Sequence, residues 1–243
     1  MSHAKAESLL AASDTLSEAI GELDFAPPVT HVYNPHRYAR EPWASYLETF
    51  ARSNKRVVFL GMNPGPWGMA QTGVPFGEIA AVRDWMGISG DVGHPEDEHP
   101  RRPVEGFECD RSEVSGRRLW GLMAERFETA EAFFDDHFVS NYCPLVFMAD
   151  SGRNITPDKL PADERKPLFR HCDEFLRAVV TTLEPEYLIG VGKFAERRAE
   201  EACSALEDPP AIASILHPSP ASPAANKDWT GTVIRQLREI GVW

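Results

Sequence analysis

The chain has 243 residues and a hydrophobic fraction of 42%, which together are typical of one sizeable globular α/β domain. Its net charge of −12 by itself argues against a nucleic-acid partner, because phosphate contacts favour a basic surface. Many of the acidic residues are concentrated in residues 1–25 and 91–110, so a local basic face can coexist with this total. No apolar run approaches the roughly 18 residues that a membrane span needs.

The N-terminal residues lack a basic stretch followed by an apolar block, so we expect no signal peptide. We therefore expect a cytoplasmic protein, or a nuclear one in a eukaryotic cell. The four cysteines include no C-x-x-C pair, so the usual spacing of zinc and iron–sulfur sites is missing. We expect reduced, partly buried thiols and no metal or other cofactor. His94 and His99 flank three acidic residues, a pattern that favours a solvated acidic loop over a metal site.

The chain alternates predicted helices with predicted strands. Residues 4–22 have apolar positions at helical spacing and predict an N-terminal helix within residues 1–25. A Pro-Pro turn at 27–28 and a second helix at 42–53 follow. Four short apolar runs predict buried strands at 56–60, 138–140, 187–191 and 212–216. The remaining predicted helices are 78–86, 116–127, 168–183, 194–206 and 230–240, and the polar residues 91–115 predict an extended surface loop.

Strands that alternate with helices imply a parallel sheet with both faces covered. We therefore predict an α/β fold in which three layers, α/β/α, enclose a central parallel four-stranded sheet, with residues 1–243 forming a single domain. In such sheets, ligands bind beyond the carboxyl ends of the strands. The chemistry is therefore expected in residues 61–77, 141–147, 192–193 and 217–227.

Residues 61–77, the first loop, read GMNPGPWGMAQTGVPFG. Connections between strands and helices are commonly about 2–6 residues, so a loop this long and this rich in glycine and proline indicates a functional site. It holds Asn63 between Met62 and Pro64, and Phe76 near its end.

Residues 217–227, the last loop, read HPSPASPAANK. His217 directly follows a predicted strand, and three prolines then stiffen the segment. Small polar or cationic residues suited to phosphate oxygens complete this loop, namely Ser219, Ser222, Asn226 and Lys227.

Together with EHPRRPV, SEVSGRRLWG, FVSNYCPLVF and SGRNITP, these two loops carry a family resemblance. The sequence resembles the single-strand-selective monofunctional uracil-DNA glycosylases, a branch of the uracil-DNA glycosylase superfamily, over roughly residues 25–240. The resemblance implies that Asn63 positions the attacking water and that His217 binds O2 of the base. It implies further that Asn141 reads the Watson–Crick edge and that Phe76 stacks on the base, in a pocket lined by Gly61, Met62 and Met69.

The residue types suit this chemistry. Cleavage of the glycosidic bond develops negative charge on the leaving base, which a hydrogen bond from His217 to O2 stabilises. The side-chain amide of Asn63 is neutral and cannot act as a strong general base, but it can orient a water molecule. Asn141 offers a donor to uracil O4 and an acceptor to N3–H, and cytosine presents the opposite pattern. Gly65 leaves space near C5 of the base, so 5-substituted uracils such as 5-hydroxymethyluracil are expected substrates.

DNA contacts are expected from the last loop and from one further lysine: Pro218, Ser219, Pro220, Ala221, Ser222, Asn226, Lys227 and Lys193. Ala221 departs from the family pattern, in which a basic residue wedges into the DNA helix, so residue 221 is not expected to act as such a wedge in duplex DNA. The segment 190–193 lacks the third glycine of a dinucleotide loop, so a phosphate contact at a helix N-terminus is the better interpretation. The arginines in 115–118 and 151–153 are candidates either for phosphate contacts or for surface ion pairs.

Three alternatives have less support. A zinc nucleobase deaminase would need H-x-E and P-C-x-x-C motifs, and neither occurs. A bifunctional lyase would need a lysine in the catalytic motifs for a Schiff base. A sensor that binds damaged DNA without turnover would not need Asn63, His217 and Asn141 together. The sequence therefore predicts a monomeric glycosylase that acts on uracil or modified uracil in single- and double-stranded DNA, without a metal or a membrane partner.

Overall fold

The computed structural model describes residues 2–243, and its centre is a four-stranded parallel sheet. The strands are β2 (Val57–Gly61), β3 (His137–Asn141), β6 (Tyr187–Val191) and β7 (Ala211–Ile215), arranged in the order β3-β2-β6-β7. Every residue of β2 and β3 is buried, as expected for strands covered on both faces. The predicted central sheet is therefore confirmed, with Asn141 as the last residue of β3.

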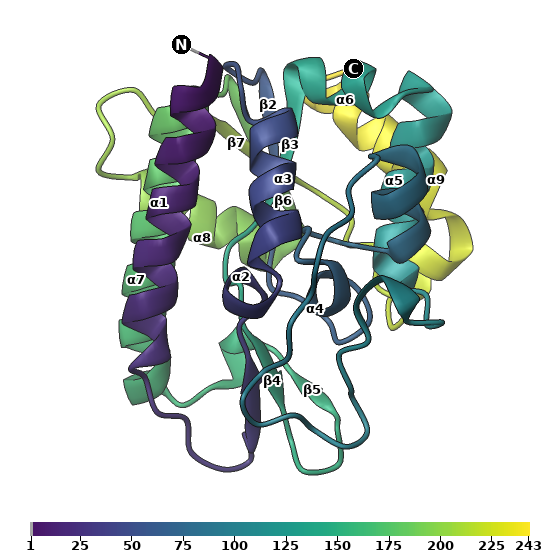
Figure 1. Cartoon of the computed structure of the whole chain (residues 1–243). Coiled ribbons are helices and arrows are strands. Elements are labelled where there is room, and N and C mark those ends of the chain that lie inside the picture. The colour runs from purple at the N-terminus through teal and green to yellow at the C-terminus, as the bar shows by residue number, and fades with distance from the viewer. Residues whose placement is uncertain (1) are drawn as a thin grey trace.

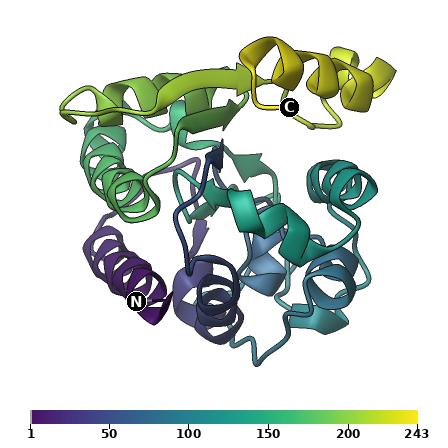
Figure 2. The same cartoon turned by 90° about the horizontal axis from the view of Figure 1, so that it is seen from above.

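Helices cover both faces of this sheet. The longer helices are α1 (Ser2–Gly21), α3 (Arg40–Phe50), α5 (Val114–Phe127), α6 (Ala130–Asp136), α7 (Ala162–Leu183), α8 (Lys193–Cys203) and α9 (Pro223–Ile240). In Figure 1, α1, α7 and α8 lie on one side of the sheet, and α5 and α9 lie on the other. Figure 2, which looks along the helices from above, shows the sheet between these two groups. The predicted α/β/α architecture is thus confirmed.

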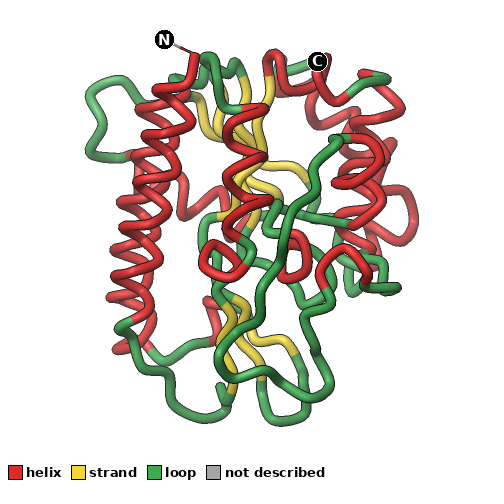
Figure 3. Tube along the Cα trace, viewed as in Figure 1, coloured by secondary structure: helices red, strands yellow, loops and turns green. Residues whose placement is uncertain are grey.

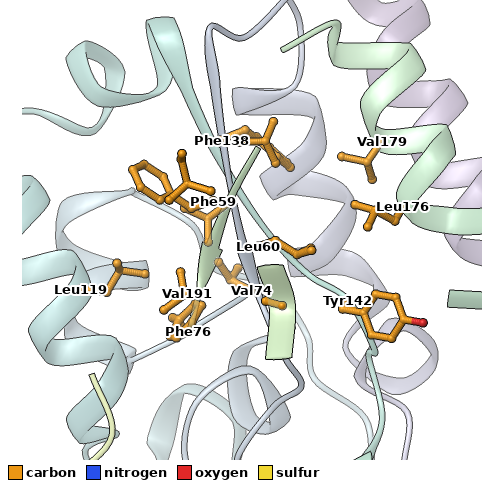
Figure 4. Packing of buried hydrophobic residues seen from close by; sticks show 14 of the residues in the cluster. Phe59, Leu60, Val74, Phe76, Leu119, Phe138, Tyr142, Leu176, Val179 and Val191 are labelled. Atoms are coloured by element: carbon orange, nitrogen blue, oxygen red, sulfur yellow. The ribbon is translucent and has the colours of Figure 1, made fainter. Parts of the chain in front are cut away.

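The hydrophobic core fills the two spaces between the sheet and its helices. Consecutive residues of β2 point to opposite faces, with Phe59 directed toward the side of Leu119 on α5 and Leu60 toward the side of Leu176 on α7 (Figure 4). All four side chains are buried. Phe76, from the first loop, belongs to the same packed cluster, so the loop is fixed to the core.

A second, antiparallel sheet was not predicted. It consists of β1 (His31–Tyr33), β4 (Val146–Met148) and β5 (Asn154–Ile155), in the order β1-β4-β5. Figure 3 shows these strands as a separate group beyond the end of the main sheet. The sequence predicts a connecting loop for residues 141–147, but β4 begins within that segment. Strands of two or three residues are too short to produce a recognisable alternation, so their pairing depends on tertiary contacts.

Residues 91–115 form a surface loop only in part. His99 is buried, its backbone N–H donates to the Tyr33 hydroxyl at 2.7 Å, and its Nε2 lies 3.0 Å from the carbonyl oxygen of Asp150. The expectation of a wholly solvated acidic loop is therefore wrong at His99, which ties the loop to the small sheet. The loop also contains a 3₁₀ turn, Gly106–Glu108.

Other differences concern boundaries and short helices. The helix predicted at 78–86 is observed as a π-helical turn, Ala81–Trp85. The helix α7 begins before residue 168 despite Pro167, and α9 begins at Pro223 and is broken at Asp228. Four short elements were not predicted: α2 (Pro35–Tyr38), α4 (Met69–Thr72), α6 and the turn Pro157–Lys159. All four cysteines are buried free thiols. Among residues 2–243, no helix is long and apolar enough to cross a membrane.

Candidate active site

A cavity of about 350 Å³ lies at the carboxyl end of the parallel sheet. Its lining comes from the first loop, the end of β3, the last loop, the start of α5 and strand β5. The predicted site residues that line it are Met62, Asn63, Gly65, Met69, Phe76, Asn141, His217 and Ser219. Segments far apart in the sequence therefore meet at the edge of the sheet where ligands were expected.

The side-chain amide of Asn63 is held by two backbone carbonyl groups. Its Nδ2 donates to the carbonyl oxygen of Leu145 at 3.1 Å and to that of Pro64 at 3.2 Å. Both amide hydrogens are therefore used by the protein. The remaining polar atom, Oδ1, is a hydrogen-bond acceptor, and an acceptor is what the orientation of a water molecule requires.

The imidazole of His217 has a defined tautomer. The backbone N–H of Ser219 donates to Nδ1 of His217 at 3.0 Å, so Nδ1 is an acceptor and the proton of the neutral ring resides on Nε2. Burial lowers the pKa of His217 below its ordinary value, which favours the neutral ring. His217 thus presents an N–H donor at Nε2 without carrying a positive charge.

Asn141 and Phe76 approach each other because residue 61 has no side chain. A Cβ atom on Gly61 would lie 2.2 Å from Oδ1 of Asn141 and 2.7 Å from Cε2 of Phe76, distances that no real side chain tolerates. Nδ2 of Asn141 also lies 3.3 Å from Sδ of Met69, which orients the amide. Gly61 therefore does not line the cavity itself, but its lack of a side chain leaves the space that the side chains of Asn141 and Phe76 occupy.

Phe76 has a left-handed backbone conformation, with φ of 52°, which is rare for a bulky residue. Its carbonyl oxygen accepts hydrogen bonds from Nε1 of Trp120 at 2.9 Å and from the backbone N–H of Glu78 at 2.7 Å. These contacts stabilise the unusual geometry, which costs on the order of 1–3 kcal/mol. The aromatic ring lies 6.4 Å from the His217 ring, on the same cavity.

Arg118 of α5 fixes the last loop. Its Nη1 donates to the carbonyl oxygens of Pro218 at 3.0 Å and Ser219 at 3.4 Å, and its Nη2 donates to Oδ1 of Asn226 at 2.9 Å. Nδ2 of Asn226 in turn donates to the carbonyl oxygen of Pro220 at 2.8 Å. The guanidinium group of Arg118 is therefore used to join the last loop to α5 and, within the described part of the chain, it forms no ion pair with a carboxylate.

Sequence similarity identifies the family of the chain. The family model described as "Uracil DNA glycosylase superfamily" matches residues 48–238. The chain belongs to the uracil-DNA glycosylase superfamily. This membership confirms the resemblance found in the motifs.

Relatives match this glycosylase over nearly its whole length. The single-strand selective monofunctional uracil DNA glycosylase of Bos taurus is 48% identical over 237 residues, which cover 98% of this chain and 87% of the relative. The proteins of that name from Rattus norvegicus and Mus musculus are 47% and 46% identical, and the alignments cover 98% of this chain and 85% of each relative. The crystal structure of SMUG2 from Pedobacter heparinus has a TM-score of 0.64 at 19% identity, covers 95% of this chain and 98% of that one, and supports the fold.

Several residues predicted to contact DNA lie outside the glycosylase cavity. Ala221 and Lys227 are exposed, and Ser222 caps α9 by accepting a hydrogen bond from the backbone N–H of Ala225 at 3.3 Å. Lys193 is the first residue of α8, and its exposed side chain is paired with Glu196 at 2.7 Å. The lining of the cavity includes Ser219 but none of these four residues.

Five lining residues of this glycosylase were not singled out from the sequence: Pro64, Glu113, Ser115, Asn154 and Thr156. Signals for four of them existed, because Glu113 and Ser115 belong to SEVSG and Asn154 and Thr156 belong to SGRNITP. Both segments were recognised as family segments, but nothing in their spacing indicated that they reach the pocket. Across residues 2–243, no group of three or more His, Cys, Asp or Glu side chains is placed to hold a metal ion.

Proposed function

We propose that this protein is a monofunctional glycosylase that flips uracil out of DNA and hydrolyses its N-glycosidic bond, the first step of base excision repair. The observation that carries the proposal is the fixed polarity of two groups on one cavity. Asn63 presents a free acceptor and His217 presents a neutral N–H donor. An acceptor for water and a donor for the leaving base are the two groups that this hydrolysis needs.

In the proposed reaction, Oδ1 of Asn63 accepts a hydrogen bond from a water molecule and directs its oxygen toward C1′ of the sugar. The bond between C1′ and N1 breaks, and its electron pair stays on the base. Nε2–H of His217 donates to O2, where the negative charge of the departing uracil anion develops. The water oxygen bonds to C1′ and loses one proton to solvent, and the uracil anion takes up one proton from solvent at N1, so the products are an abasic sugar and neutral uracil.

Selection of the base is proposed to depend on Asn141 and Phe76. The Asn141 amide pairs with O4 and N3–H of uracil, and cytosine would leave these buried groups unpaired. The Phe76 ring stacks on the base. Because residue 65 is glycine, we include 5-substituted uracils such as 5-hydroxymethyluracil among the substrates.

The proposed DNA partner contacts the last loop and Lys193 through Pro218, Ser219, Pro220, Ala221, Ser222, Asn226 and Lys227. Extrusion of a nucleotide costs a few kcal/mol and is easiest from a single strand. We further propose that residues 1–243 act as one domain and as a monomer, in the cytoplasm or, in a eukaryotic cell, in the nucleus. One continuous hydrophobic core that includes residues from α1 to the C-terminus supports the single domain.

Single-turnover excision of uracil from an oligonucleotide tests the catalytic roles. Asn63→Ala and His217→Ala should each lower the rate by at least about 10²-fold, the usual scale for the loss of one oriented group. Binding to uracil-containing DNA should persist in both variants, and EDTA should leave the wild-type rate unchanged. Wild-type excision in either variant would contradict the assignment, and binding without any excision by the wild-type protein would indicate a sensor.

A further inference from the structure

A groove of about 300 Å³, separate from the glycosylase cavity, is lined by α7 and by Arg198 of α8. Five of its seven lining residues are cationic, namely Arg165, Lys166, Arg170, Arg177 and Arg198, and the proposed mechanism uses none of them. This concentration of positive charge occurs in a chain whose net charge is −12. A basic groove on an otherwise acidic protein indicates an anionic ligand.

Most of the positive charge in this groove is not compensated by the protein. Asp173 is the one acidic residue in the lining, and Nη2 of Arg198 donates to its two carboxylate oxygens at 2.7 and 2.6 Å. Arg198 also pairs with Glu201. Within residues 2–243, the other four cations form no ion pair, and two of them, Arg165 and Arg177, donate to backbone carbonyl oxygens. The groove therefore keeps four positive charges for a ligand.

Three of these four cations form a line along α7. Lys166, Arg170 and Arg177 lie four and seven residues apart, spacings that place them on one face of a helix. At about 1.5 Å per residue, the line extends for roughly 16 Å. Lys166 and Arg170 are exposed, and Arg177 is half-buried. A single phosphate would contact only part of this line, so the groove fits an extended polyanion.

The groove is connected to two segments that line the cavity. Tyr142 follows Asn141 at the end of β3, and its ring lies on the α7 side of the sheet (Figure 4), where its hydroxyl donates to Oδ1 of Asp173 at 2.7 Å. Nη1 of Arg165 donates at 3.0 Å to a carbonyl oxygen in the 3₁₀ turn that follows Thr156. Asn141 and Thr156 both line the cavity. A DNA strand that leaves the cavity toward α7 therefore meets this groove.

We propose that this groove binds the phosphates of single-stranded DNA next to the excised uracil. The inference rests on the proposed function, because its ligand is the strand that carries the uracil. Guanidinium and ammonium groups bind phosphate oxygens without reading the sequence. The ring of Phe169, the groove's aromatic residue, already faces Arg198 at 4.6 Å and Arg165 at 6.0 Å, so the groove offers charge and no platform for stacked bases.

The position of the groove favours a single strand over a duplex. The cavity lies at the carboxyl end of the sheet, whereas the groove lies on the side of the molecule that α7 and α8 cover (Figure 1). A strand must therefore bend to occupy both sites. Duplex DNA has a persistence length of about 50 nm and resists such a bend, whereas a single strand follows a charged groove readily.

Single-stranded oligonucleotides of two lengths test the groove. The short one has uracil with about two nucleotides on each side, and the long one has about ten, within the range that single-strand sites cover. The groove variant combines Lys166→Gln and Arg170→Gln, because both side chains are exposed and form no ion pair within residues 2–243. The charge-matched control combines Arg235→Gln and Arg238→Gln, near the end of α9. That end lies opposite the cavity, because Arg56, directly before β2, donates to the two carbonyl groups that follow α9.

We expect wild type to bind the long oligonucleotide more tightly than the short one. The groove variant should lose about tenfold in affinity for the long oligonucleotide at low salt. The slope of log K against log salt should become less steep by about 1.4, or about 0.7 for each lost phosphate contact. Affinity for the short oligonucleotide, and single-turnover excision from it, should stay within about twofold of wild type. The control variant should match wild type on both lengths.

Equal losses in the groove and control variants, or equal losses on both lengths, would show general attraction to DNA and overturn the proposal. Unchanged affinity of the groove variant for the long oligonucleotide would also overturn it, and excision from the short one would show that the proposed function stands. If DNA binding is unchanged but a poly-glutamate peptide binds wild type and not the groove variant, the groove serves an acidic protein segment instead. Failure of wild type to excise uracil from either oligonucleotide would contradict the proposed function itself.

Discussion

At the scale of single residues, the amide of Asn63 and the imidazole of His217 each have polar atoms engaged by the backbone. The carbonyl oxygen of Leu145 holds one side of the Asn63 amide, and the N–H of Ser219 selects the tautomer of His217. Because these partners are main-chain groups, they are fixed by the fold and by the prolines of the two loops. The two side chains proposed to take part in the reaction are therefore oriented before substrate binds, which would limit the reorganisation needed during the reaction.

Gly61 provides a prediction at this scale. The Cβ atom of Gly61→Ala would collide with Asn141 and Phe76, so we expect base recognition to be displaced and uracil excision to fall by at least about 10²-fold. Gly121 is the matched control, since a Cβ atom there meets nothing within 4 Å and lies in the interior of α5. Gly121→Ala should keep wild-type activity and gain up to about 1 kcal/mol of stability. Single-turnover rates and thermal unfolding of both variants check this, and equal activity of the two would contradict the packing argument.

At the scale of elements, the last loop is an anchored segment with an exposed tip. Arg118 holds its backbone at two carbonyl groups, and Ser222 begins α9 as its N-cap. Between these fixed points Ala221 is exposed, and the lining of the cavity does not include it. Alanine offers little volume and no charge to fill the space that a flipped base leaves in a duplex. We therefore expect the loop to contact DNA but to offset little of the cost of extruding a base.

We accordingly expect excision rates to decrease from single-stranded uracil to a U·G mismatch and then to a U·A pair, following the energy of pairing. Ala221→Arg should accelerate the U·A duplex most and change the single strand little. Ala221→Leu, which adds volume without charge, separates wedging from attraction to phosphates. The measurement is the single-turnover rate of wild type, Ala221→Arg and Ala221→Leu on single-stranded uracil, the U·G mismatch and the U·A pair. An equal gain on every substrate would show general DNA attraction, contrary to the expected wedge.

At the scale of the whole molecule, buried histidines link folding to pH. His36 stacks on Trp43 with ring centroids 4.4 Å apart, and its Nδ1 has no hydrogen-bond partner. Burial lowers the pKa of His36 from 6.5 to about 3 and that of His137 to about 4. As the pH falls below about 6.5, these two histidines therefore become protonated in the unfolded chain but stay neutral in the folded chain. The stability present above that pH is lost progressively toward pH 4.

His36→Phe tests this linkage. Between pH 7.5 and pH 5, the free energy of unfolding of the variant should fall by about 2 kcal/mol less than that of wild type, because one buried histidine no longer titrates. His94→Gln alters an exposed histidine and should retain the wild-type loss. Denaturant unfolding at both pH values measures the difference. Identical pH dependence in wild type and His36→Phe would contradict the assignment of His36 as a neutral buried group.

The sequence by itself determined the parallel sheet and the place of the chemistry. Four apolar runs separated by helical patterns allow few arrangements other than a covered parallel sheet, and the strand ends then bring the first and last loops to one edge. Asn63, Phe76, Asn141 and His217 were identified because they occur in long, specific motifs. Local sequence patterns are sufficient to predict those features of the fold that depend only on hydrophobic periodicity and chain connectivity.

Only the tertiary structure decided the antiparallel pairing of the three short strands in the small sheet, the tautomer of His217, and the presence of Glu113 and Asn154 in the cavity. The sequence gives no sign that Glu113 meets Gly65, because the two residues come from separate elements and their contact has no periodic signal. Hydrogen-bond direction is likewise set by groups from distant segments, as the contact between Asn63 and Leu145 illustrates. The physical reason is that periodicity reports which face of an element is buried, whereas the contacts at that face depend on how elements pack.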